Sequence, residues 1–122
     1  MKSETQNYWV VGANWDGDNH EDAFCRGGYW EMGYADAEKP EFTERRDSIK
    51  HGDRIAIKSR DGHGADTISI KAIGIVKKII EGKVYVEWVL TKMDRHVPCK
   101  NYLGTIHGPV EDINWMNEAF RL

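Results

Sequence analysis

The chain has 122 residues, a length that predicts a single domain spanning residues 1–122. Hydrophobic residues make up 40% and charged residues 30% of the sequence, which is typical of a folded globular protein and excludes a disordered chain. No apolar run approaches the roughly 20 residues that a membrane-spanning helix needs, and the opening MKSETQN lacks the apolar segment of a secretory signal. We therefore expect a cytoplasmic protein with no membrane partner.

The net charge of −3 hides an uneven distribution of charged residues. Residues 50–102 carry a balance of +5, and the rest of the chain carries −8. This asymmetry allows one basic face on an acidic body. The same charge balances would also arise if the charged residues were scattered over the whole surface. The charge alone therefore leaves both interpretations open, a basic face and scattered charge.

The first third of the chain predicts a strand followed by a short helix. Tyr8 to Asn14 alternates in a strand-like way and ends at the turn signal Asp16-Gly17. Asp18 or Asn19 is then expected to cap a helix that runs to Arg26 and ends at Gly27-Gly28.

The middle of the chain predicts a second helix and a second strand. Thr43 is a candidate N-cap, and Gly52 is a candidate end of that helix. The strand from Asp53 to Ser59 places Ile55 and Ile57 on a buried face, with its charged residues on the other.

A long strand is predicted from Thr67 to Ile80. Its apolar residues change from even to odd positions near Ala72 and Gly74, which requires a bulge or a sharp coil. Glu81-Gly82 predicts a hairpin turn, and Val84 to Leu90 forms the returning strand. With a last helix expected over Asp112 to Phe120, the fold class is α+β, mostly β: a small curved β-barrel with short peripheral helices.

Catalytic and metal motifs are absent from the sequence. The five histidines lack the i, i+4 ligand spacing, and the acidic run after Asp16 fails the register of a calcium loop. Cys25 and Cys99 are too far apart for a zinc half-site, so we expect free thiols. Cys25 with His20 as a nucleophile and its base is the less favoured alternative to a buried cysteine. We predict no metal, no cofactor and no enzymatic activity.

The aromatic residues are the unusual feature, with five Trp, five Tyr and three Phe. Trp9, Trp88 and Trp115 occupy positions expected in the core. Trp15 and Trp30 lie at the ends of elements beside glycines, where a stacking pocket and ordinary rim packing are equally compatible with the spacing.

Several runs occur in an order shared with a known family. They are YWVVGANWDG from Tyr8, GYWEMGY from Gly28, IKHGDRIAIK from Ile49, IKAIG from Ile70, VEW from Val86 and YLGTIH from Tyr102. The order is similar to that of EVE-like domains of the PUA superfamily, which stand at the N-terminus of McrB-type restriction ATPases and related HNH nucleases. We expect no motor or nuclease domain to follow in this chain, which is a departure from those relatives.

The resemblance implies a PUA-like fold that accepts a flipped, modified base. In the related YTH domains, a Gly-x-Trp after the first helix forms a wall of the base cage, and Trp30 matches that position. Asn14 and Asp16 match the neighbourhood that hydrogen-bonds the base edge. Trp15 is our candidate for a second wall, because the short loop from Ser59 to Asp66 offers none.

We therefore expect a non-catalytic reader of a methylated or hydroxymethylated base, in DNA more than in RNA, that acts in restriction or defence. A separately encoded ATPase or nuclease is a possible partner. Salt-sensitive phosphate contacts are expected from six cations: Lys58, Arg60, Lys71, Lys77, Lys78 and Arg95. The alternatives are a protein-interaction module that docks through the acidic segment Asp16 to Asp22 and, with less support, a hydrolase or RNA-modifying enzyme on the same fold.

Overall fold

The computed structural model describes residues 6–122. Residues 1–5 belong to the opening segment that lacks the pattern of a secretory signal, and they lie outside the described residues. In this part of the chain the strands are β1 (Tyr8–Gly12), β2 (Asn14–Trp15), β3 (Asp18–Asn19), β4 (Tyr29–Trp30), β5 (Arg54–Arg60), β6 (Thr67–Ile80), β7 (Lys83–Leu90), β8 (Arg95–Pro98) and β9 (Ile106–His107). The helices are α1 (Glu21–Gly27), α2 (Pro40–Ser48) and α3 (Ile113–Ala119).

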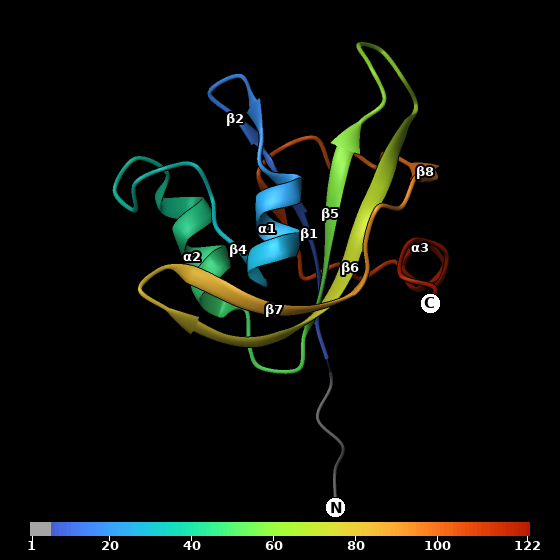
Figure 1. Cartoon of the computed structure of the whole chain (residues 1–122). Coiled ribbons are helices and arrows are strands. Elements are labelled where there is room, and N and C mark those ends of the chain that lie inside the picture. The colour runs from blue at the N-terminus through green and yellow to red at the C-terminus, as the bar shows by residue number, and fades with distance from the viewer. Residues whose placement is uncertain (1–5) are drawn as a thin grey trace, which may run out of the picture.

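The fold is α+β and mostly strands, with one sheet that curls into a half-barrel (Figure 1). The strand order is β4-β7-β6-β5-β1-β9, and β8 pairs with the first part of β6. All neighbours are antiparallel except β1 and β5, which run parallel. The coarse prediction of a curved, strand-rich α+β fold is thus confirmed.

The predicted bulge in the long strand is present in β6. Ile57 pairs with Ala72 and Lys58 pairs with Ile70, so Lys71 is an extra residue in the register with β5. Such an extra residue bends and twists a strand. The predicted bounds of this strand, Thr67 to Ile80, are those observed, and Glu81 and Gly82 form its hairpin turn, both with positive φ.

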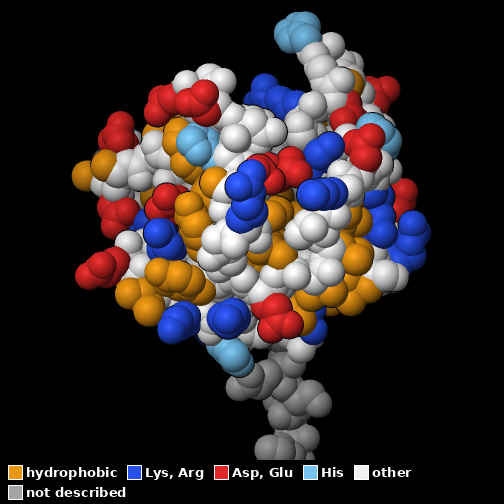
Figure 2. Space-filling model, in the orientation of Figure 1, with side chains coloured by type: hydrophobic (Ala, Val, Ile, Leu, Met, Phe, Trp, Pro, Cys, Tyr) orange, Lys and Arg blue, Asp and Glu red, His pale blue; other side chains and the backbone are white. Residues whose placement is uncertain are grey.

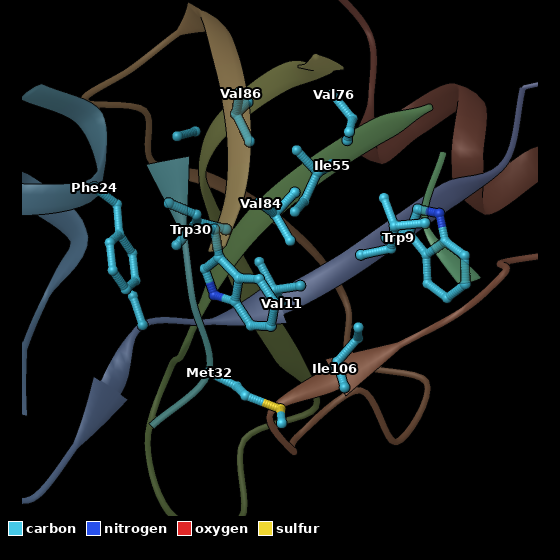
Figure 3. Packing of buried hydrophobic residues seen from close by; sticks show 14 residues of the cluster. Trp9, Val11, Phe24, Trp30, Met32, Ile55, Val76, Val84, Val86 and Ile106 are labelled. Carbon is cyan, nitrogen blue, oxygen red and sulfur yellow. The ribbon is translucent and has the colours of Figure 1, made fainter. Parts of the chain in front are cut away.

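The sheet is packed on both faces. One cluster holds Trp9, Ile55 and Ile57 with residues of α1 and β4, and Figure 3 shows part of it. A second cluster contains Ala56 and packs against α3. The face of β5 opposite Ile55 and Ile57 is therefore covered as well, by α3 and the C-terminal segment.

The helix ends agree only in part with the sequence pattern. Gly28 ends α1 in the left-handed conformation as expected, but the N-cap is His20 and not Asp18 or Asn19, which form β3. α2 begins at Pro40, so Thr43 lies inside it and is not a cap. For α3 the prediction holds, since the Asp112 carboxylate accepts a hydrogen bond from the Trp115 N–H (3.0 Å). None of the helices within residues 6–122 is long and apolar enough to cross a bilayer.

Charged side chains of both signs are mixed over the face shown in Figure 2, with apolar side chains between them. This face has no continuous basic patch. The +5 balance of residues 50–102 therefore does not translate into a single positive surface on this side.

Candidate functional site

A cavity of about 440 Å³ opens where β1 and β5 end. These strands are parallel neighbours, with Gly12 opposite Lys58, so their carboxyl ends meet at one edge of the sheet. Segments from three other parts of the chain complete the wall. The lining residues are Gly12, Ala13, Asn14, Trp15, Gly33, Tyr34, Lys58, Ser59, Arg60, Leu103, Gly104 and Thr105. The volume lies within the range of about 300–1,000 Å³ that small-molecule sites occupy.

Two of the four residues predicted to bind a base line this cavity. Asn14 is exposed and Trp15 is half-buried, and both belong to β2. Asp16 is exposed at the turn between β2 and β3 and does not line the cavity. Asn14 can therefore meet a ligand in the cavity, whereas Asp16, which we expected to hydrogen-bond the base edge, lies outside it.

The prediction of Trp30 as a stacking wall is wrong, because its side chain is 0% exposed. It lies in the core with Val11 and Met32 (Figure 3). Its indole Nε1–H donates to the carbonyl oxygen of Gly12 (2.8 Å), where β1 reaches the cavity. Trp30 supports the floor of the cavity from within, and a base cannot reach its ring.

Trp15 is already in contact with protein groups. Its indole stacks on the His20 ring, with ring centroids 3.9 Å apart and an interplanar angle of 15°. Gly33 also packs on it so closely that an added Cβ would lie 2.4 Å from the indole Cγ. Trp15 is therefore held in a fixed orientation, and its role as a free stacking surface is reduced.

Tyr34 is the aromatic residue that the sequence reasoning missed. It lines the cavity with 38% of its surface exposed, and Lys39 Nζ lies 5.5 Å from the centre of its ring. Ser59 and the segment 103–105 were also given no role. The runs that contain Tyr34 and residues 103–105 carried the family resemblance, but their residue types indicated no particular chemistry.

Two of the six predicted phosphate-binding cations, Lys58 and Arg60, line the cavity. The other four lie outside it. Lys71 pairs with Asp94 (3.4 Å), and Arg95 donates to the carbonyl oxygens of Ala119 and Arg121. Lys78 lies over the ring of Tyr85, and Lys77 is exposed on β6.

Lys58 is 5% exposed, although it is charged at neutral pH. Burial, and secondly the charge of Arg60, lower the pKa of Lys58 from 10.5 to about 8. No ion pair within residues 6–122 involves its ammonium group. The cavity thus contains a buried positive charge that the described residues do not neutralise.

The neighbouring loop is fixed by two further basic residues. Arg60 donates from Nε and Nη2 to the Leu103 carbonyl oxygen (3.1 and 2.7 Å). His107 Nε2 accepts a hydrogen bond from the Gly104 N–H (2.8 Å). Burial, with Lys58 and Arg45 nearby, lowers the pKa of His107 to about 4, so this ring is neutral at pH 7.

The described residues offer little for covalent or metal chemistry. Burial and nearby carboxylates raise the pKa of Cys25 to about 11, so this thiol is not a nucleophile at neutral pH. Ser69, His96 and Asp61 meet, but Ser69 and Asp61 both contact His96 Nδ1, whereas a catalytic relay uses both ring nitrogens. No group of three or more His, Cys, Asp or Glu within residues 6–122 could hold a metal ion.

Comparisons of the chain with protein-family models, with curated proteins and with solved structures found no match. The resemblance to EVE-like domains therefore remains an expectation from the sequence runs alone.

Proposed function

We propose that this chain is a non-catalytic nucleic-acid-binding module with a PUA-like fold that accepts a flipped, modified base of DNA in the cavity between the ends of β1 and β5. The observation that carries the proposal is the composition of this cavity. It brings together an amide (Asn14), two aromatic side chains (Trp15 and Tyr34) and two cations (Lys58 and Arg60). A nucleotide offers a partner to each of these groups.

In this proposal Tyr34 takes the stacking role that the sequence assigned to Trp30. Tyr34 lines the cavity with 38% of its surface exposed, and stacking of a base on an aromatic side chain contributes about 1–3 kcal/mol. That gain offsets the few kcal/mol needed to take a base out of the stack. The Asn14 amide both donates and accepts hydrogen bonds, so it suits the edge of a base that has lost its pairing partner.

Recognition of a modification should be modest. A buried methyl group contributes about 0.8 kcal/mol, which corresponds to about a fourfold difference in affinity. Strong discrimination then requires that the unmodified base leave a void or trap a water in the cavity. A separately encoded ATPase or nuclease is the partner we propose for a role in restriction or defence.

Replacing Tyr34 with alanine is expected to weaken binding of a fluorescently labelled DNA strand containing one 5-methylcytosine by about 5- to 150-fold. Tyr34→Phe keeps the stacking face and should bind within about twofold of the parent. The measurement is fluorescence anisotropy at several salt concentrations. If two cations contact phosphates of a single strand, log K should fall against log salt with a slope of about −1.4.

The second candidate function is protein docking through Asp16 to Asp22. Asp16, Asp18 and Asp22 are all exposed, which favours a contact with a basic protein surface. If the parent and Tyr34→Ala bind the strand equally weakly, the base-reading proposal is wrong and this candidate is preferred. The same anisotropy measurement is repeated with a DNA duplex that contains the same modified base.

A further inference from the structure

Among the cations within residues 6–122, Lys58 combines burial with a place in the cavity wall, and its ammonium group lies close to the backbone of Gly12. An added Cβ at Gly12 would lie 3.4 Å from Lys58 Nζ and 3.3 Å from the Gly104 carbonyl oxygen. The absence of a side chain at Gly12 therefore makes room for the ammonium group and the Gly104 carbonyl oxygen. Lys58 lines the cavity while 95% of its surface is buried.

The groups that face Lys58 do not neutralise it. Arg60, on the same strand, adds positive charge. His107 on β9 is neutral at pH 7, and Arg45 on α2 contributes a further positive charge near it. Burying a charge is costly unless it is paired, so a protein retains such a residue at a cost in stability when a ligand supplies the opposite charge.

The cavity wall matches a phosphate group. None of the described carboxylates lines it, whereas a second cavity, of about 280 Å³, contains Glu41 and Glu44 beside Arg45. Arg60 uses two of its five N–H donors on Leu103, and the other three remain for a ligand. The hydroxyl group of Thr105 adds a further donor, whereas that of Ser59 is directed at the Arg60 carbonyl oxygen (3.5 Å).

We infer that Lys58 and Arg60 form a phosphate subsite, which holds the phosphate of a bound nucleotide at the β5 side of the cavity. The base then lies toward Asn14 and Tyr34. The exposed carboxylates of Asp16 and Asp18, next to the Asn14 side, disfavour the reverse orientation. The identity of the ligand as a nucleotide rests on the proposed function, but the anion site itself does not.

This subsite predicts a specific pH dependence. Phosphate binds the protonated amine, and the pKa of Lys58 in the free protein is about 8. Affinity should be full below that pH and should decrease as the pH rises through it. Because phosphate is mostly a dianion from about pH 7.5 to about pH 9.5, a loss of affinity of about sixfold over this interval would come from the protein.

The experiment uses protein that is isotopically labelled at its lysine side chains. The pKa of Lys58 is measured from its side-chain NMR signal, with and without inorganic phosphate, at constant ionic strength. Phosphate is expected to raise the pKa of Lys58 by about one unit, since a unit corresponds to tenfold stronger binding of the protonated form. Lys58→Met should weaken phosphate binding at least about tenfold. Lys77→Met removes the same charge from an exposed position outside the cavity, and it should change the affinity for phosphate less than about twofold.

Two further arms separate this inference from the proposed function. They use thymidine 5′-monophosphate and the methylated DNA strand, which present a terminal and an internal phosphate. If the strand binds the parent and Lys58→Met equally, the subsite is wrong while base reading stands. If phosphate shifts Lys58 but neither nucleotide binds, the subsite stands and base reading fails. An unchanged Lys58 pKa in phosphate would overturn the inference directly.

Discussion

Trp30→Ala is expected to lower the free energy of unfolding by about 3–5 kcal/mol, the range measured for buried tryptophans and phenylalanines in other proteins. The side chain is 0% exposed and packs within the cluster that contains Val11 and Met32. The substitution also leaves the Gly12 carbonyl oxygen without its indole donor. Urea denaturation should show a lower midpoint with an unchanged m-value.

Two companion variants make this prediction specific. Trp30→Phe retains most of the packing and should cost about 1–3 kcal/mol for the lost hydrogen bond. Trp88→Ala should cost less than Trp30→Ala, because Trp88 is only partly buried. A Trp30→Ala protein of parental stability that fails to bind nucleic acid would show that Trp30 is a ligand-binding residue and not a core residue.

Lys58→Met is expected to have the opposite effect, raising the free energy of unfolding at pH 7 in a buffer without phosphate. The folded-state pKa is about 8 and the ordinary value is 10.5, which corresponds to a penalty of about 3 kcal/mol at about 1.4 kcal/mol per unit. Methionine has a similar length and carries no charge to bury. Lys77→Met, at an exposed position, should stay within about 0.5 kcal/mol of the parent.

The sign of the pH dependence follows from the lowered pKa. Below about pH 8 both the folded and the unfolded chain hold the proton, so the parent bears the full penalty. Between about pH 8 and pH 10.5 the folded chain releases the proton while the unfolded chain keeps it, so this contribution to the parent's stability improves as pH rises. The advantage of Lys58→Met should shrink over that interval. A variant less stable than the parent at pH 7 would show that the ammonium group is paired.

Local patterns predicted four of the strands, β1, β5, β6 and β7, and the last helix well. The parity change in Thr67 to Ile80 indicated a bulge because one extra residue reverses which side chains face the core, and Lys71 is that residue. The last helix was expected over Asp112 to Phe120, and the Asp112 carboxylate caps it through a contact only three residues away. Such features depend on neighbours in the sequence, so they can be derived from it.

The candidate site is formed by contacts between segments that are distant in the sequence. Local sequence patterns do not predict such contacts. Alternation placed Lys58 on the face of the strand opposite Ile55 and Ile57. Nothing in the neighbouring sequence indicates that α3 and the C-terminal segment cover that side of β5, so the burial of Lys58 could not be predicted. Trp30 next to glycines resembled a pocket wall, but its indole turns inward to reach Gly12, eighteen residues earlier. Tyr34 and Thr105 approach the cavity from separate loops, and no spacing rule connects them.

The most direct test of the central claim, that the cavity binds nucleic acid, is an NMR titration of the ¹⁵N-labelled protein with the methylated DNA strand. Shifts are predicted at the backbone amides of Asn14, Tyr34, Ser59 and Thr105, which line the cavity. The indole N–H of Trp30, held on Gly12 in the core, should move little. Shifts confined to Asp16 to Asp22, with the signals of Ser59 and Thr105 unchanged, would contradict the claim.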